Sequence, residues 1–282
     1  MRFLRTTTPI LAVLALAAAA VAWRPAPAQA ATIESSTSSN WAGYAVSPAD
    51  PSTSFTSASG SWVQPTADCS SSSPGYSAFW VGLGGLADES QALEQIGTEA
   101  DCTAGGAAVY SAWYELVPAA PVRLKLKIAA GDTLSARVAV TGQTVSLHIS
   151  NTTRGTVFTK KLRMASPDVS SAEWIAEAPS ACNGYGGCRP LPLTNFGTVT
   201  FAGATATAGG HTGTISDPAW PETAIALQAD GGGFYHGRFA GLAAAADATP
   251  AALSSDGASF AISWQQATGG PDPQQQPDPF SE

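Results

Sequence analysis

Apolar and polar residues alternate with a period of two through much of this chain, and the pattern predicts β-strands. In a strand, residues i, i+2 and i+4 share one face, so alternation is what a half-buried strand requires. The clearest run consists of four consecutive segments separated by short turns that contain Gly, Thr or Asn. These segments are 123–128, 133–140, 144–150 and 156–162. After residue 30 no helical period of useful length occurs.

Further candidate strands recur about every ten residues, with turn-forming residues between them. They are 59–65, 77–83, 93–97, 110–116, 171–178, 197–202, 223–229 and 259–264. Residues 242–253 fit a short helix or a loop equally well. So many short strands predict an all-β fold, an antiparallel sandwich or barrel, with enough chain for two large packed sheets in one domain.

The two ends of the chain differ from the middle. Residues 1–30 begin with two arginines, Arg2 and Arg5, followed by a short apolar run and by small residues before Ala30, which is typical of a cleaved signal peptide; a retained membrane anchor is the alternative. Residues 268–282 are rich in Pro, Gln and Asp and are expected to form a disordered tail. We therefore expect a secreted, extracellular protein with a single domain at 31–267.

Charge limits the choice of partners. Removal of residues 1–30 takes away three arginines and leaves ten basic against 21 acidic residues, a net charge of −11. Such a chain is not expected to bind nucleic acid, whose phosphates require basic residues, or a membrane once the signal is removed. Only 12% of the residues are charged, so acidification creates little repulsion, which suits an acidic medium. We expect a monomer.

Four cysteines in a secreted chain indicate two disulfides, with three possible connectivities. We favour Cys69–Cys102 and the small loop Cys182–Cys188, where the glycines of NGYGG allow a tight turn. A zinc site is the alternative, but the spacing lacks paired CxxC motifs. We expect no metal and no cofactor.

Carboxylates and an amide fall on strand faces beside aromatic residues. In AEWIAEAP, at 172–179, strand alternation puts Glu173 and Glu177 on one face. Trp113 and Glu115 share a face of their strand, and Gln95 falls on the same face as the leucine two positions before it. These side chains could line one concave sheet face. The alternative is that each is an ordinary residue on a solvated sheet face.

Other catalytic arrangements have less support. His148, His211 and His236 are far apart and lack the spacing of metal ligands, so each is expected to be structural or exposed. No GxSxG motif marks a nucleophilic serine. The sequence NTT at Asn151 matches a glycosylation site but is also explained as a turn.

Five segments together resemble the glutamic peptidases, the eqolisin family. They are SSNWAGYAV at 38–46, FWVGLGG at 79–85, LEQIG at 93–97, SAWYELVP at 111–118 and AEWIAE at 172–177. Their order and approximate separations are those of the family, and the resemblance covers about residues 39–264.

The resemblance implies a fold, an activity and a site. The family fold is a lectin-like jelly roll of two antiparallel sheets, one of which is curved to form the substrate groove. The family's catalytic glutamine matches Gln95, and its catalytic glutamate matches Glu177, which makes Glu173 a structural or rim acid. The resemblance also implies supporting and substrate-binding roles for Trp41, Trp80, Trp113 and Glu115.

The chain departs from the family pattern at two places. Many members have an aspartate where this chain has Gly84, so one supporting acid is missing. Fungal members also have a long prosegment, whereas here only residues 31–38 separate the predicted cleavage site from Ser39. Activation by removal of a large propeptide is therefore not expected.

Such a pair can hydrolyse peptide bonds in acid. Ionised Glu177 would take a proton from water and return it to the leaving nitrogen, while the Gln95 amide would stabilise the oxyanion. The expected function is a secreted acid endopeptidase that acts on polypeptides. Two alternatives remain: a glycosidase with Glu115 and Glu177 as its paired carboxylates, and a non-catalytic module that binds carbohydrate or peptide.

Overall fold

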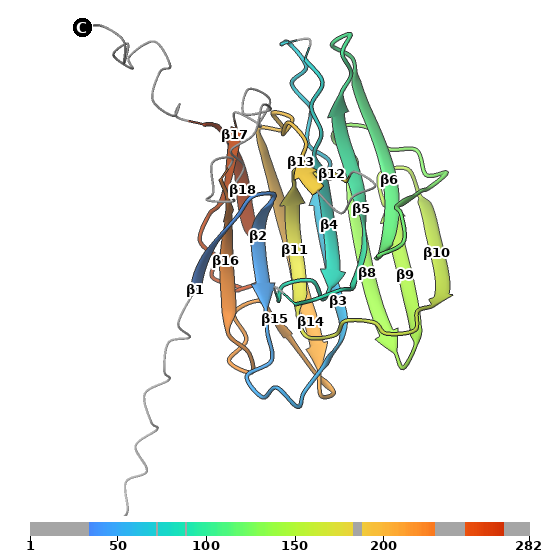
Figure 1. Cartoon of the computed structure of the whole chain (residues 1–282), viewed down its shortest axis with the longest axis vertical. Coiled ribbons are helices and arrows are strands. Elements are labelled where there is room, and N and C mark those ends of the chain that lie inside the picture. Colours follow the sequence, from blue (N-terminus) through green and yellow to red (C-terminus); the bar gives the residue numbers. More distant parts are fainter. Residues whose placement is uncertain (1–33, 72, 88, 183–187, 229–245, 268–282) are drawn as a thin grey trace, which may run out of the picture. The chain divides into compact units, whose positions relative to one another are not determined.

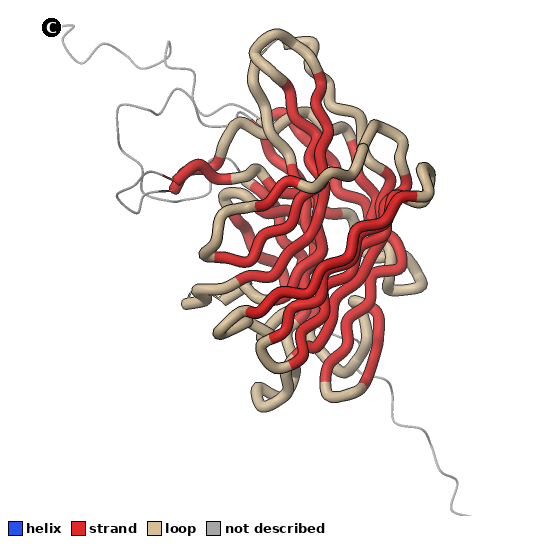
Figure 2. Tube along the Cα trace, turned by 90° about the vertical axis from the view of Figure 1, so that its right-hand side faces the viewer, coloured by secondary structure: helices blue, strands red, loops and turns tan. Residues whose placement is uncertain are grey.

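The computed structural model of the chain describes residues 34–71, 73–87, 89–182, 188–228 and 246–267. Within these ranges the chain forms strands and turns and no helix (Figure 2). None of the described residues forms a helix long and apolar enough to cross a membrane. The all-β prediction is thus confirmed, while the predicted signal at 1–30 and tail at 268–282 lie outside the described residues.

The strands lie in two layers (Figure 1). The first layer contains β1 (Glu34–Ser38), β2 (Trp41–Val46), β4 (Ala78–Leu83), β5 (Leu93–Cys102), β6 (Ala108–Val117), β7 (Val122–Arg123), β11 (Ala172–Glu177) and β16 (Glu222–Leu227). The second contains β3 (Phe55–Val63), β8 (Thr133–Thr141), β9 (Thr144–Asn151), β10 (Thr156–Arg163), β14 (Thr198–Ala208), β15 (His211–Thr214), β17 (Ala246–Pro250) and β18 (Phe260–Gln266). A separate hairpin consists of β12 (Ser180–Cys182) and β13 (Cys188–Pro190).

The two layers belong to one hydrogen-bonded sheet that folds over on itself. Strand β17 pairs with β18 of the second layer and, through Leu227 and Ala248, with β16 of the first. From there the first layer runs β16-β2-β11-β4-β5-β6-β7, and the second runs β18-β14-β3-β8-β9-β10. All described pairs are antiparallel except β1–β16 and the isolated bridge between Tyr76 and Leu193. The predicted sandwich is confirmed, with its layers joined along one side.

The core lies between the layers, where inward residues of both meet. Trp62 and Phe201 of the second layer and Phe79 and Trp174 of the first are among its largest buried side chains. The indole N–H of Trp174 donates to the backbone oxygen of Ser59, and that of Trp62 donates to the hydroxyl of Thr98, at 2.8 and 3.0 Å. These bonds cross the core, so the layers are held in a fixed relation.

The central strands of the first layer are buried on both faces. Every residue of β4 is buried, as are nearly all of β2 and β11. A strand buried on one face alternates, whereas a strand buried on both faces reads as a continuous apolar run. The second face is covered by its own cluster of large side chains, which includes Trp80, Trp113 and Ile175. We call this surface the outer face of the first layer.

The predicted strand at 123–128 is wrong beyond its first residue. Only Arg123 belongs to a strand, yet Leu124, Leu126 and Ile128 are buried and the lysines between them are exposed. Alternating burial requires only an extended backbone that packs on one side, and ladder pairing is a separate condition. Residues 246–250 of the undecided segment form β17.

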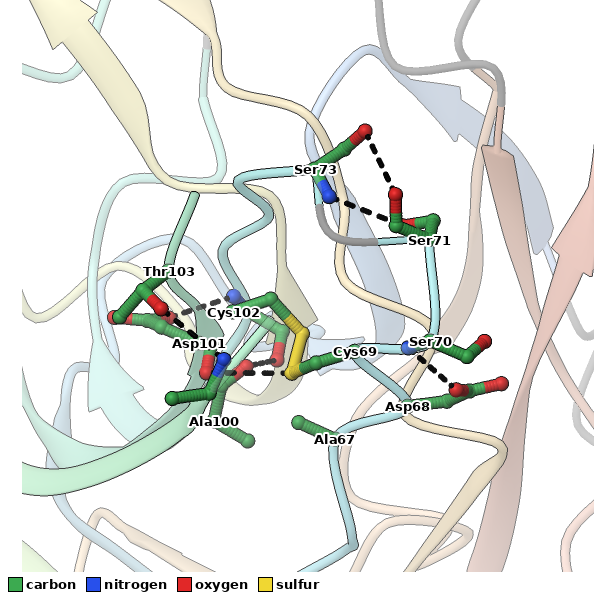
Figure 3. The surroundings of a disulfide bond; sticks show 12 residues. Ala67, Asp68, Cys69, Ser70, Ser71, Ser73, Ala100, Asp101, Cys102 and Thr103 are labelled. Carbon is green, nitrogen blue, oxygen red and sulfur yellow. Dashed lines mark hydrogen bonds between the residues drawn. A yellow bond between two sulfur atoms is a disulfide. The ribbon is translucent and has the colours of Figure 1, made fainter. Parts of the chain in front are cut away.

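The predicted disulfide Cys69–Cys102 is present (Figure 3). It ties the end of β5 to the loop after β3, with Cα atoms 5.3 Å apart and the two cysteines 33 positions apart in sequence. Cys182 and Cys188 are opposite each other in the β12–β13 hairpin, and Cys188 is disulfide-bonded. The side chain of Cys182 lies outside the described residues, so that pairing stays a prediction.

Removing the Cys69–Cys102 bond should reduce stability. Opening a loop of this length increases the entropy of the unfolded chain by an amount worth about 3–4 kcal/mol. We expect the double variant Cys69→Ala/Cys102→Ala to lose about that much in the free energy of unfolding, measured by urea denaturation under oxidising conditions. A loss below about 1 kcal/mol would mean that the loop is constrained by its other contacts.

Candidate active site

The predicted site residues lie on adjacent strands of the first layer and point away from the core. One row across the sheet consists of Ile175 on β11, Trp80 on β4, Gly97 on β5 and Trp113 on β6. Gln95 and Glu115 occupy the next row, and their neighbours in sequence, such as Tyr114, belong to the core. The faces predicted from strand alternation for Gln95, Trp113, Glu115 and Glu177 are therefore confirmed.

Glycine makes room for the tryptophans. A Cβ atom at Gly97 would lie 2.2 Å from the backbone oxygen of Phe79 and 2.6 Å from the Cβ atom of Trp80. Gly97 sits between Trp80 and Trp113 in the row, so it lets both large rings lie on one face. Trp41 of β2 then packs edge-on against Trp80, with ring centroids 5.0 Å apart.

Glu177 is fixed by donors at both carboxylate oxygens. The indole N–H of Trp80 donates to Oε2 at 2.8 Å, and the amide of Asn40 donates to Oε1 at 3.1 Å. Burial raises the pKa of Glu177 to about 7, the nearby Glu115 carboxylate adds to the rise, and these donors oppose it. A carboxyl with a pKa near 7 exchanges protons readily at neutral pH, as an acid–base catalyst requires.

Gln95 is oriented by a neighbouring carboxylate. Its Nε2 donates to Oε2 of Glu115 at 2.8 Å, across the β5–β6 pair. Because an ionised carboxylate only accepts, this bond fixes which end of the amide is the nitrogen. Burial raises the pKa of Glu115, and the Gln95 hydrogen bond opposes the rise. The Oε1 atom of Gln95 is buried and has no hydrogen-bond partner among the described residues.

Glu115 connects the two halves of the site. Gln95 and Glu177 are not hydrogen-bonded to each other within the described part of the chain, but the charge of Glu115 acts on Glu177 while its carboxylate holds Gln95. The indole N–H of Trp113 is also buried without a partner among the described residues. Unused polar groups on an apolar face are what a substrate with its own donors and acceptors would satisfy.

Glu173 is not a rim acid. Its side chain is fully buried, and neither carboxylate oxygen has a hydrogen-bond partner among the described residues. Burial raises its pKa well above the usual value, and the nearby Asp168 and Glu94 carboxylates add to the rise. Strand alternation predicted correctly which face of β11 carries Glu173. How deeply this end of β11 is buried depends on the neighbouring strands and loops.

Another segment supplies an acid beside Gly84. A Cβ atom at this glycine, whose φ is +82°, would lie 2.4 Å from the Cβ atom of Asp168. The Asp168 carboxylate accepts hydrogen bonds from the backbone N–H of Gly85 and the hydroxyl of Ser90, so it orders the loop after β4. The acid that the sequence lacks at position 84 thus has a counterpart from the loop before β11.

Sequence reasoning missed Asn40 and Asp168. Asn40 precedes β2, outside the alternating run, so its direction could not be deduced from strand parity. Within the segment 38–46, the sequence predicted a site role only for the neighbouring Trp41. Asp168 lies more than 80 positions from Gly85, and no local pattern links them.

The two described histidines, His148 and His211, do not contribute to this face. His148 lies on β9 of the second layer, and His211 is hydrogen-bonded to Asp217 at 2.9 Å. His236 lies outside the described residues. No group of three His, Cys, Asp or Glu side chains that could hold a metal ion occurs in the described ranges.

Comparison with known proteins gives one family and one fold. The model of the Peptidase A4 family matches residues 39–232. No curated protein matches the sequence. Among solved structures, scytalido-glutamic peptidase with a transition state analog inhibitor is similar at a TM-score of 0.62 and 23% identity, over 80% of this chain and 98% of that one.

Two further structures have the same fold. SCP-B, a member of the eqolisin family of peptidases in complex with the tripeptide Ala-Ile-His, matches at a TM-score of 0.58 and 22% identity, over 80% of this chain and 98% of that one. Aspergilloglutamic peptidase from Aspergillus niger matches at a TM-score of 0.52 and 26% identity, over 68% of this chain and 99% of that one.

The buried acids should make the protein more stable in acid than at neutral pH. Burial raises the pKa of Glu94 to about 8 and that of Asp101 to about 7, and it raises that of Glu173 as well. The folded state then keeps protons that the unfolded chain releases above about pH 4.5, so the free energy of unfolding falls as the pH rises from there to about 8.

Urea denaturation at several pH values measures this slope. We expect Glu173→Gln, which keeps the shape and removes the titration, to be more stable than the unaltered protein at about pH 7.5 and to show little difference at about pH 4. An equal effect at both pH values would contradict the assignment.

Proposed function

The chain belongs to the Peptidase A4 family of peptide-bond hydrolases, and from this we propose that it is an acid endopeptidase in which Glu177 and Gln95 form the catalytic pair. The observation that carries the proposal is the pair of donors on Glu177, because Trp80 and Asn40 hold a carboxyl of raised pKa on a partly apolar face. Gln95 lies on the same face, with one end of its amide fixed and the other unused.

Gln95 can bind both the attacking water and the carbonyl oxygen of the substrate. Its Nε2 has two N–H groups, and Glu115 accepts one of them. The second N–H can donate to the substrate oxygen, where negative charge develops, while Oε1 accepts a hydrogen bond from the water. A neutral amide keeps this capacity at every pH.

The pKa of Glu177 determines how it acts in acid. With a pKa of about 7, most Glu177 is protonated at acid pH, so an ionised base would be scarce. We therefore propose that neutral Glu177 starts the reaction. Its unprotonated oxygen accepts a proton from water as the water oxygen bonds to the carbonyl carbon, and its own proton moves to the substrate oxygen.

Collapse of the tetrahedral diol uses the same carboxyl. Glu177 takes the proton of one diol hydroxyl at one oxygen and gives its proton to the amide nitrogen, whose bond to carbon breaks. The products are a carboxylic acid and an amine, and Glu177 is again protonated. Each step moves one proton to and one from Glu177, so no charged intermediate is required.

Substrate binding and location follow from the same surface. Trp41, Trp80 and Trp113 present large apolar rings around the pair, which suits the side chains and backbone of an extended polypeptide. The Cys69–Cys102 disulfide supports action outside the cell, where oxidising conditions preserve such bonds. We propose that the protein is secreted after loss of residues 1–30 and acts as a monomer at 31–267.

Variants of the pair test the assignment. We expect Glu177→Gln to lower kcat/KM for an acid-denatured protein on the order of a thousandfold or more, and Gln95→Ala to lower it about a hundredfold. Glu34→Gln on exposed β1 is the matched control and should keep full activity. Near-UV circular dichroism checks folding. An active, folded Glu177→Gln variant would exclude Glu177 from catalysis.

The pH dependence of kcat/KM distinguishes the two starting states of Glu177. If neutral Glu177 starts the reaction, activity on a short peptide without ionisable side chains is retained in acid and falls as the pH rises through about 7. If the ionised form is the base, activity instead falls as the pH drops below about 7.

Two further assays test the class of enzyme. Pepstatin should not inhibit peptide cleavage, and release of reducing sugar from glycans in place of peptide cleavage would support a glycosidase.

A further inference from the structure

The outer face of the second layer carries a basic depression far from the catalytic groups in the fold. It has a volume of about 310 Å³. Its outward lining residues come from β8, β9 and β10 and are Arg137, Ala139, Ser146, His148, Thr159 and Lys161. The catalytic pair faces outward from the first layer, so the core of the sandwich separates the two surfaces.

The strand register places these residues in two adjacent rows. Arg137, His148 and Thr159 form one row, and Ala139, Ser146 and Lys161 form the next. The small side chains of Ala139 and Ser146 form the floor, while longer basic side chains stand around it. Neighbouring rows on one face are about 7 Å apart and neighbouring strands about 5 Å, so the cations are close enough to contact one bound chain together.

Charge on this surface is opposite to that of the whole protein. Residues 133–167 contain five Lys or Arg residues and no Asp or Glu, although the chain has 21 acidic residues. Three of the five, Arg137, Lys161 and Arg163, occupy outward positions, whereas Lys160 donates to the hydroxyl of Tyr114 and Arg154 pairs with Asp132. Lys161 makes no ion pair or side-chain hydrogen bond with another described residue, and Arg137 donates only to the hydroxyl of Ser57, at 3.1 Å. No described acidic residue pairs with Arg137 or Lys161, so their positive charge is available to a ligand.

Protection of a sheet edge does not account for this arrangement. Strand β10 is an edge strand, and Lys160, Lys161 and Arg163 on it are of the kind that blocks pairing with another molecule. Arg137 lies on β8 and His148 on β9, however, and both strands are paired on each side. Edge protection requires no basic residue at these inner positions.

We propose that this depression binds a carboxylate-bearing polysaccharide. Arg137 and Lys161 would pair with carboxylates on neighbouring sugars. The hydroxyls of Ser146 and Thr159, which make no side-chain hydrogen bond with another described residue, would bind sugar hydroxyls. Arg163 lies one row beyond Lys161 on β10 and extends the basic track along the strand.

The lining argues against other polyanions. No outward position of β8, β9 or β10 carries a Trp, Tyr or Phe residue, the large rings on which nucleic acid bases stack best. Val157 is the single large apolar residue among the outward positions of these three strands, so the face also lacks the Trp, Phe or Leu residues that insert into a membrane surface. The site would hold a secreted enzyme on an acidic glycan without involving its catalytic face.

Binding of polygalacturonate oligosaccharides by the full-length secreted protein tests the proposal. Calorimetry at about pH 6, where the sugar carboxylates are ionised, should show binding that weakens as salt is added. We expect Arg137→Gln and Lys161→Gln each to weaken it about tenfold. The control Lys125→Gln/Lys127→Gln changes two exposed cations outside the depression and should leave the affinity within about twofold.

Three results would overturn the proposal. They are no binding by the unaltered protein, equal losses in the pocket and control variants, and a preference for a short DNA duplex or anionic lipid vesicles over the oligosaccharide. Near-UV circular dichroism and cleavage of a short neutral peptide show whether each variant is folded. Both readouts report on parts of the molecule remote from the depression, so a loss of binding alone identifies the site.

Discussion

The hydrogen bond from the Trp80 indole to Glu177 is the interaction on which the rest of the site depends. It fixes the carboxyl and places a large ring beside it, so it both orients the group and removes water from around it. That ring fits on the sheet only because position 97 is glycine. Trp41 then packs on the ring, and Asn40, next to it in sequence, reaches the other oxygen of Glu177. One contact thereby joins three strands into the proposed acid–base site.

Burial of the first layer on both faces has a second consequence. Carboxyls on β5 and β11 end up away from water whether or not they take part in catalysis, and their pKa values rise because the charged form loses its hydration. Glu94 and Glu173 are therefore expected to lower the free energy of unfolding at neutral pH. In acid both are protonated, and this penalty is absent. The same burial that tunes Glu177 therefore favours an acidic working medium, so stability and activity are linked through one physical cause.

The outer faces of the two layers differ in charge and exposure, and the two proposed roles follow this difference. The first layer presents an apolar face with buried acids, which suits a polypeptide and proton transfer. The second presents hydroxyls and cations without a single acid from 133 to 167, which suits an anionic polymer. A sandwich allows this division because strand alternation gives each layer one outer face of independent composition, while the shared core fixes the geometry of both.

The sequence by itself predicted most of the long strands and the faces of Gln95, Trp113, Glu115 and Glu177, because period-two alternation is a local property. It favoured the Cys69–Cys102 disulfide among three connectivities, and the structure confirms that pairing. It could not determine which strands are neighbours. The fold-over at β17, the unpaired stretch at 124–128 and the approach of Asp168 to Gly84 depend on partners far along the chain. The hydrogen bond of Asn40 to Glu177 and the full burial of Glu173 likewise depend on the tertiary structure. Burial and hydrogen bonding are set by what lies across the sheet, and alternation carries no information about that.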